Sequence, residues 1–474
     1  MVFSSLLFLF RFLPIVLFIY YAVPCCMNYL WKNMVLFLFS LFFYAWGEPI
    51  YIFLMLFSTI VDYINGGLTG YFIKRKKKGI ARIFLVCSII INLSLLGIFK
   101  YAGFFCEVMN QFFGISLPVK ELALPIGISF YTFQTMSYTI DIYRKEAEPE
   151  RNIIHFGAYV SLFPQLIAGP IVRFQEIAKQ LRERKHSLEH ISYGILRFVT
   201  GLGKKVLLAN SAGLVWTEVT KYSSLEMTTV AAWLGLLFYM FQIYFDFSGY
   251  SDMAIGLMAM FGFDIEENFK YPYTARSITE FWRKWHISLG TWFREYVYIP
   301  LGGNRKGKLR TYGNIFLVWF LTGFWHGASL NFICWGLYFC AFLIVEKCGF
   351  LKKLEKLPAW IGHGYVCLIV YFGWLIFAWQ DIEGHRVFLK AMAGLGSAGF
   401  VNRQALYLFV TNFVLLIALI LGSTELPKRS IAWICRKREG MEAILQTIFI
   451  ITIFLLSTSY LVNASYNPFL YFRF

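Results

Sequence analysis

The chain has few charged residues and no long polar stretch. Of its 474 residues, only 15% are Asp, Glu, Lys or Arg, whereas 58% are hydrophobic and 20% are aromatic. Soluble domains carry about 25% charged residues, and the mean hydropathy here is +0.59. The composition therefore argues against a soluble protein and predicts an integral membrane protein, with residues 1–474 forming a single membrane domain.

Metal-binding and phosphate-binding motifs are also absent from the sequence. The nine cysteines form no Cys-x-x-Cys pair and no metal-like spacing with histidine, and the adjacent Cys25 and Cys26 suit neither a disulfide framework nor a zinc site. The Gly302-Gly303 pair lacks a following Gly-Lys-Ser/Thr, so it predicts a turn and not a phosphate loop. We expect no metal and no permanently bound cofactor.

Acidic residues are scarce relative to basic ones, which leaves a net charge of +17. An excess of Lys and Arg in short loops is typical of the cytoplasmic side of membrane proteins. We therefore expect these loops to be cytoplasmic and expect no nucleic-acid partner. The basic loops comprise residues 74–78, 173–185, 305–310, 352–356 and 436–438.

Apolar stretches recur along the whole chain, and each spanning helix needs about 20 residues. We expect an all-α polytopic protein with about 10–12 membrane segments. Alternation from the loop at 74–78 places the N- and C-termini outside the cytoplasm. The stretches are 6–23, 34–46, 50–63, 83–99, 122–142, 191–208, 228–261, 315–345, 361–379, 405–421 and 443–461.

Two apolar stretches, 153–171 and 315–345, each lie between basic loops that we assign to the same side. Each stretch must therefore enter the membrane and return, and Pro164 and Pro170 supply breaks in the first. Irregular backbone at membrane depth must be buried in protein or line a cavity. The second stretch places His326 near its turn, inside the protein.

Histidine is rare, with seven in the chain, and two of them are candidates for chemistry. An ionisable side chain at membrane depth is a functional-site hypothesis by default, and His326 meets that description. The alternative is a core histidine hydrogen-bonded between helices. His286 lies on a predicted amphipathic helix that starts at a Ser277–Glu280 capping box, where it could instead satisfy a backbone carbonyl. The inward face of this helix comprises Trp282, Trp285, His286, Leu289, Phe293 and Tyr296.

Six stretches together resemble the membrane-bound O-acyltransferase family, in its bacterial branch that acetylates envelope and extracellular polysaccharides. They extend over about 200 residues, in the order found in the family. The stretches are 125–134, 163–170, 244–256, 281–289, 298–305 and 323–328.

The resemblance implies a helical shell around a central tunnel, with His326 matching the family's near-invariant histidine and His286 its second histidine. It implies a bacterial inner-membrane enzyme that takes acetyl from cytoplasmic acetyl-CoA. The acetyl group would pass outward to a separate SGNH-type transferase and then to a polysaccharide. The extracytoplasmic tail at 467–474 resembles an acyl-relay motif of this branch, in which the hydroxyl of Tyr471 takes the acyl group.

Basic residues beside the expected tunnel mouth could bind the phosphates of coenzyme A, because arginine offers bidentate contacts, although cytoplasmic loops look the same without a ligand. We take Arg283, Lys284, Arg294 and Arg305 as the candidates. In the stretch at 228–261, which Ser248-Gly249 is expected to interrupt, Asp246 and Asp252 are candidates for structural ion pairs with Lys204 or Lys205.

Two other functions stay open at this point. One is transfer of D-alanine or another acyl group from a carrier protein, as in a cousin within the family. The other is transport of an envelope precursor, for which discontinuous helices are typical. No convincing internal repeat is present, which counts against transport.

Overall fold

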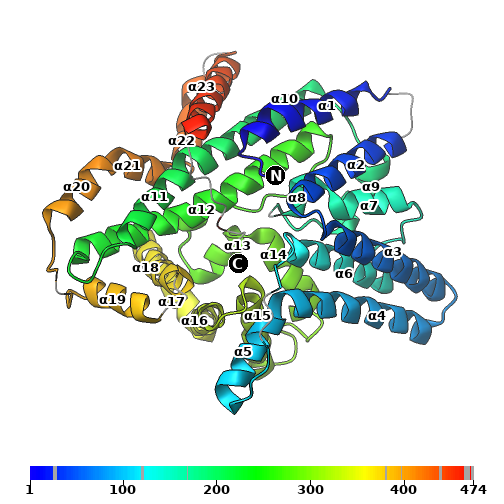
Figure 1. Cartoon of the computed structure of the whole chain (residues 1–474), viewed down its shortest axis with the longest axis horizontal. Coiled ribbons are helices and arrows are strands. Elements are labelled where there is room, and N and C mark those ends of the chain that lie inside the picture. Colours follow the sequence, from blue (N-terminus) through cyan, green and yellow to red (C-terminus); the bar gives the residue numbers. More distant parts are fainter. Residues whose placement is uncertain are drawn as a thin grey trace. The chain divides into compact units, whose positions relative to one another are not determined.

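The computed structural model describes residues 1–24, 29–118, 122–167, 169–378, 382–396, 398–436, 440–463 and 470. Every regular element in these ranges is a helix (Figure 1). The helices form two compact units, residues 1–198 with 251–266 and residues 199–250 with 267–474. The predicted all-α architecture is confirmed.

Seven helical stretches in the described ranges are long and apolar enough to cross a membrane. An eighth is added if the helix pair at Arg403–Thr411 and Phe413–Gly422, bent by 52°, counts as one span. The chain is therefore a multi-pass membrane protein. The other stretches expected to cross are helical but shorter or more polar, so the number of crossings stays a prediction.

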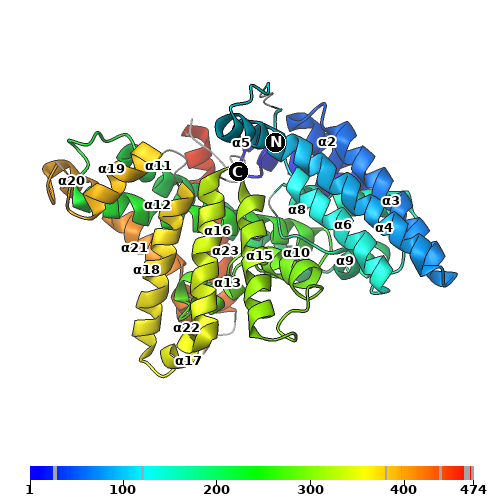
Figure 2. The same ribbon diagram turned by 90° about the horizontal axis from the view of Figure 1, so that it is seen from below.

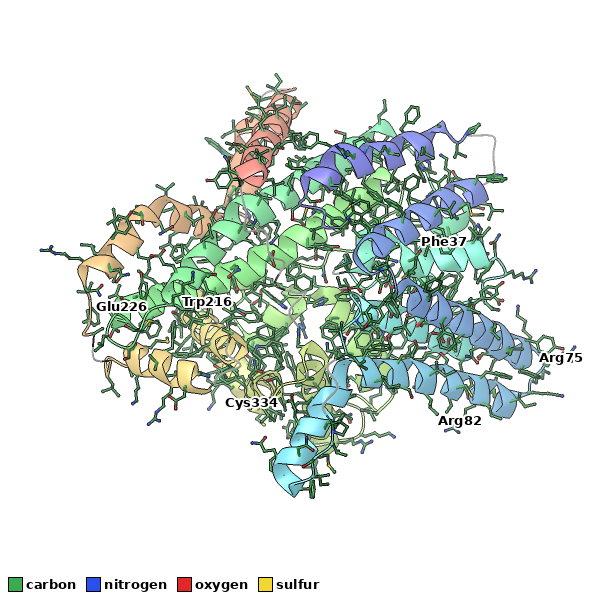
Figure 3. The ribbon with its side chains drawn as sticks, in the orientation of Figure 1. Phe37, Arg75, Arg82, Trp216, Glu226 and Cys334 are labelled. Carbon is green, nitrogen blue, oxygen red and sulfur yellow. The ribbon has the colours of Figure 1, made fainter. Side chains whose placement is uncertain are left out.

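The first unit contains nine helices of its own among the described residues. They are α1 (Leu13–Ala22), α2 (Tyr29–Gly47), α3 (Ile52–Lys74), α4 (Lys78–Leu96), α5 (Ala102–Phe113), α6 (Ile128–Arg144), α7 (Ile153–Ser161), α8 (Phe163–Leu166) and α9 (Phe174–Arg182). The α7 and α8 helices have nine and four residues, fewer than the roughly 20 that a span requires. Figure 3 shows Arg75 and Arg82 extending outward from the ends of α3 and α4, as expected of a basic loop.

A buried polar network joins α3, α4 and α6 in this unit. Asp62 is fully buried and accepts hydrogen bonds from Ser88 Oγ at 2.5 Å and from Asn92 Nδ2 at 2.6 Å. Asn92 Oδ1 in turn accepts from Ser58 and Thr135. Because buried polar groups are costly unless they are hydrogen-bonded, this network fixes how the three helices pack.

Two helices, α10 (Leu188–Gly203) and α12 (Thr229–Met260), contribute residues to both units. The second unit otherwise contains α11 (Asn210–Val219), α13 (Ile278–Lys284), α14 (Ile287–Phe293), α15 (Lys308–His326), α16 (Leu330–Val345), α17 (Leu351–Leu354), α18 (Ala359–Ala378), α19 (Ile382–Met392), α20 (Arg403–Thr411), α21 (Phe413–Gly422), α22 (Leu426–Cys435) and α23 (Met441–Asn463). Five π-helical segments and one 3-10 turn complete the described elements: η1 (Phe8–Phe12), η2 (Gly97–Tyr101), η3 (Lys204–Ala209), η4 (Pro272–Thr274), η5 (Arg294–Tyr298) and η6 (Glu346–Phe350).

Helices α15 and α16 form the hairpin expected for 315–345 and lie side by side in Figure 2. Glycines let their backbones approach closely. A Cβ on Gly323 would lie 2.4 Å from the carbonyl oxygen of Phe332, and one on Gly336 would lie 2.4 Å from that of Trp319. Small residues serve this purpose at helix contacts in membranes. The hairpin places His326 at the last residue of α15, beside the turn, as predicted.

Helix α12 runs without a break, so the predicted interruption at Ser248-Gly249 is wrong. Gly249 instead marks a close helix contact, because a Cβ there would lie 2.8 Å from the carbonyl oxygen of Gly201. The glycine is used for its small size and not for its flexibility.

Candidate active site

His326 is 8% exposed and surrounded by aromatic rings of the second unit. Its ring centroid lies 4.9 Å from Trp325, 4.9 Å from Trp335 and 5.4 Å from Phe377, each in an edge-on arrangement. The α15 helix ends at this residue, and the C-terminal end of a helix favours a positive charge. The imidazole is therefore held at the C-terminal end of a helix dipole, among aromatic rings.

A small cavity of about 20 Å³ adjoins His326. This volume is close to what one water molecule requires. Three contributions to its wall matter for chemistry: the imidazole of His326, the carboxylate of Asp246 and Leu470 of the C-terminal tail. The remaining wall residues are Ile243, Phe247, Trp285, Trp335, Trp374 and Phe377.

The tail reaches this cavity through a hydrogen bond. The backbone N–H of Leu470 donates to Asp246 Oδ2 at 2.8 Å, and Lys205 Nζ lies 2.5 Å from Asp246 Oδ1. The predicted pairing of Asp246 with Lys205 is thus confirmed. Asp252 pairs instead with Arg197, whose Nη2 lies 2.6 Å from Asp252 Oδ1. Tyr471 itself lies outside the described residues.

His286 lies at a break between α13 and α14, so the single amphipathic helix expected over this stretch is wrong. Its φ of 44° is in the left-handed region, which residues other than glycine seldom adopt. Backbone groups near the break bond to a distant segment: Ile287 N donates to Asn268 O, and Lys270 N donates to Lys284 O. These tertiary bonds replace helical ones, and nothing in the local sequence predicts them.

The start of α13 matches the prediction in part. Ser277 Oγ accepts from Glu280 N at 3.0 Å, as in a capping box, but the Glu280 carboxylate accepts from Arg276 N. A second cap comes from Glu346, which is buried and accepts from the backbone N–H groups of Ile278 and Thr279. Glu346 thereby attaches the start of α13 to the end of the α16 segment.

His286 is 3% exposed and faces inward, as predicted. Its Nδ1 lies 3.2 Å from Asn268 Oδ1, an oxygen that also accepts from Ser288 N and Ser288 Oγ. Because that oxygen can only accept, Nδ1 carries the hydrogen, which leaves a lone pair on Nε2. Among the described residues Nε2 has no hydrogen-bond partner. Burial lowers the pKa of His286 to about 3, so the ring is neutral at physiological pH.

The two histidines share one aromatic neighbour. The ring of Trp325 has its centroid 4.9 Å from that of His326 and 6.2 Å from that of His286. Phe247 packs edge-on against His286 at 4.6 Å and also lines the His326 cavity. The fold therefore brings both histidines to one aromatic cluster. Sequence reasoning did not identify Asn268, Trp325 or Phe247 as parts of this site.

The four predicted donor-binding residues differ in their surroundings. Lys284 Nζ lies 2.7 Å from Glu280, and Arg294 lies 2.9 Å from Glu295. Arg283, Arg294 and Arg305 are all exposed, but among the described residues Arg294 alone of these three has a carboxylate at salt-bridge distance. Arg283 and Arg305 are therefore better suited to contact an external phosphate than the other two.

A larger cavity of 750 Å³ lies elsewhere in the second unit. Apolar and aromatic side chains dominate its wall, including Trp233, Phe241 and Trp360, and Arg276 and His363 add polar groups. Neither His326 nor His286 lines it. No cluster of three or more His, Cys, Asp or Glu suited to a metal ion occurs in the described ranges.

The profile of the membrane-bound O-acyltransferase family matches residues 128–377, which contain both histidines. The probable alginate O-acetylase of Pseudomonas putida is 38% identical over the full length of both chains. The peptidoglycan O-acetyltransferase of Helicobacter pylori is 34% identical over 85% of this chain and 81% of its own. The teichoic acid D-alanyltransferase of Bacillus subtilis is 28% identical over 57% of this chain and 72% of its own.

Proposed function

Because the chain belongs to the membrane-bound O-acyltransferase family, and is therefore an acyltransferase, we propose that it passes acetyl from cytoplasmic acetyl-CoA toward a polysaccharide outside the cell. The alginate- and peptidoglycan-acetylating relatives match more of the chain, at higher identity, than the D-alanylating one. Acetyl is accordingly the acyl group that we favour, and an acyltransferase is favoured over a transporter.

The shared cavity of His326 and Leu470 is the observation that carries the proposal. Tyr471 follows Leu470 directly in the chain, and adjacent Cα atoms are about 3.8 Å apart. We therefore take the hydroxyl of Tyr471 as the acceptor that His326 serves. A donor that stays in the cytoplasm and an acceptor outside need such a tethered relay.

The proposed step is a transesterification with His326 as general base. The imidazole takes the phenolic proton of Tyr471 while the phenolic oxygen attacks the thioester carbonyl of acetyl-CoA. The carbon–sulfur bond breaks, and the imidazolium returns the proton to the departing thiolate of coenzyme A. An ester on Tyr471 results, ready for transfer to a separate SGNH-type transferase and then to the polymer. Positioned bases of this kind contribute about 10²–10⁴-fold to rate.

His286 then has a supporting role, because a neutral ring with a pKa of about 3 is a weak base at pH 7. Its ring contacts Trp325 and so orients this residue, which directly precedes His326. Arg283 and Arg305 are proposed to bind the phosphates of coenzyme A at the cytoplasmic surface, with Lys284 and Arg294 contributing less.

The decisive experiment is an acetyl-trapping assay. The full chain in lipid nanodiscs is incubated with labelled acetyl-CoA, with the partner withheld, and peptides are analysed by mass spectrometry. We expect an acetyl ester on Tyr471 and none in Tyr471→Phe. Tyr460→Phe, on the exposed face of α23, is the matched control and should leave the adduct intact. Wild-type polymer acetylation by Tyr471→Phe would overturn the relay. Acylation of the chain only by a D-alanyl carrier protein would show that the transferred group is D-alanine and not acetyl.

The proposed location is the inner membrane, with both termini outside the cytoplasm. Cysteines introduced at Lys76 and Lys353 should resist a membrane-impermeant maleimide in intact cells, whereas one at Lys390 should react. Maleimide labelling of the native cysteines in the wild-type chain is measured as the background. Labelling at 76 and 353 but not at 390 would invert the topology.

A further inference from the structure

An ion pair between Asp246 of α12 and Lys205 of η3 is buried beside the His326 cavity. Both side chains are 3% exposed, and their charged atoms lie 2.5 Å apart. A buried charge pair is stable only when further hydrogen bonds satisfy the remaining oxygens and protons. On the Asp246 side, Oδ1 faces Lys205 and Oδ2 accepts the backbone N–H of Leu470 at 2.8 Å.

The contact at Leu470 is made by the main chain. Any residue other than proline at this position would offer the same N–H donor, so the bond fixes the path of the tail and does not depend on the side chain. Leu470 also lines the cavity, together with His326. A hydrogen bond to a carboxylate is also stronger than one between neutral groups.

Lys205 compensates the negative charge of the Asp246 carboxylate and orients it, because their charged atoms lie 2.5 Å apart. Without the ammonium, a carboxylate buried among aromatic rings would be destabilised in its charged form. The carboxylate is therefore available as a strong acceptor only while the pair is intact. The two residues act as one unit, with Asp246 as the part that touches the tail.

We infer that Asp246, held by Lys205, is a positioning residue that docks the C-terminal tail by its main chain at the His326 cavity. This inference rests on the proposed relay through Tyr471, because docking Leu470 is what would keep the next side chain near the imidazole. The hydrogen bond between the Leu470 N–H and Asp246, called the dock below, can be measured without reference to acetyl transfer.

The first test asks whether the tail is held. Purified full-length protein is digested with carboxypeptidase Y, and the shortened C-termini are identified by mass spectrometry. We expect digestion of the wild type and of Leu470→Ala to slow before Leu470. Leu470→Pro lacks the N–H donor. Once each rate is divided by that of the free peptide 467–474 of the same sequence, which corrects for slow cleavage next to proline, this variant should lose the tail about 10-fold faster, in line with the strength of a charge-assisted hydrogen bond. Equal rates for Leu470→Pro and Leu470→Ala would overturn the dock.

The second test uses matched substitutions at the other side of the contact. In a Lys205→Met background, Asp246→Asn keeps an oxygen acceptor, whereas Asp246→Leu has a similar volume and none. Both variants remove the two buried charges, so they share the same loss of the ion pair. We expect the leucine variant alone to show fast tail digestion, and equal digestion of the two would overturn the role of Asp246.

A third measurement links the dock to acetyl transfer. In the leucine variant the rate of Tyr471 acetylation should fall about 10-fold relative to the asparagine variant, with an unchanged KM for acetyl-CoA. A raised KM for acetyl-CoA in the leucine variant would instead assign Asp246 a structural role in the cavity. If the wild type forms no ester on Tyr471 but the digestion pattern is as expected, the relay fails and the dock stands.

Discussion

His326 and His286 are both buried among aromatic rings and both contact Trp325, but their environments differ in three ways. His326 ends a helix, adjoins a cavity and shares that cavity with the C-terminal tail. His286 lies at a left-handed break, bonds to Asn268 and has a pKa lowered to about 3 by burial. The cavity, and not burial, is therefore what favours His326 over His286 as the proposed base.

The sharpest test of this comparison is removal of the His326 ring. His326→Ala should lower acetylation of Tyr471 and of polymer by roughly 10²–10⁴-fold, the contribution of a positioned base. Membrane insertion should stay close to wild type, whereas the thermal transition should fall modestly, because the ring packs against Trp325, Trp335 and Phe377. Wild-type turnover of acetyl-CoA by the purified variant would remove His326 from the chemistry.

The second prediction concerns the hairpin that positions His326. Gly336→Ala places a Cβ 2.4 Å from the carbonyl oxygen of Trp319, a backbone atom that no rotamer change can move. We expect a loss of about 1–3 kcal/mol in stability and a large loss of acetylation, measured by thermal unfolding in detergent and by the trapping assay. Gly313→Ala on the same hairpin meets nothing within 4 Å and is the control. Equal effects of the two would show that the close contact is unimportant.

The third prediction separates the backbone of His286 from its ring. Asparagine tolerates left-handed backbone better than alanine, so His286→Asn should be more stable than His286→Ala by about 0.5–1 kcal/mol, although both lack the imidazole. Acetylation should fall less in either variant than in His326→Ala. A loss equal to that of His326→Ala in a well-folded His286→Asn would make His286 a partner in the chemistry.

His286 also predicts how stability depends on pH. Its folded pKa of about 3 lies below the usual value of 6.5, so the unfolded chain binds the proton more readily. The contribution of this residue to stability is complete above pH 6.5 and is lost as the pH falls toward 3, by at most about 1.4 kcal/mol per pH unit. His286→Asn should flatten this part of the profile of unfolding temperature against pH, and an unchanged profile would contradict the assignment.

The smallest effects are expected at the donor-binding surface. Arg283→Gln and Arg305→Gln should each raise the KM for acetyl-CoA about 3- to 10-fold, as the loss of a charge-assisted phosphate contact predicts. Lys284→Gln and Arg294→Gln should change it less than about 2-fold, because carboxylates already pair with those charges. Similar changes in all four would favour a general electrostatic effect, which raised salt would abolish.

Much of the architecture was accessible from residue patterns. Hydropathy indicated the helices, and the basic loops on both sides of 315–345 indicated a hairpin with His326 at its turn, which the structure confirms. The pairing of Asp246 with Lys205 also followed, because buried charges need partners. The expected break at Ser248-Gly249 failed, since a glycine that permits close packing looks the same in sequence as one that permits a turn.

Residue patterns were sufficient to indicate a helical membrane protein and to show which histidine lies at a hairpin turn, because apolar length, charge bias and local spacing act over a few residues. Tertiary structure alone decided the break at His286, the capping of α13 by Glu346 and the contact of Leu470 with Asp246. Each of these depends on a polar group brought from 18 or more residues away. In a dry interior, such groups are placed by the need to satisfy buried hydrogen bonds, and that need becomes specific only once the helices have packed.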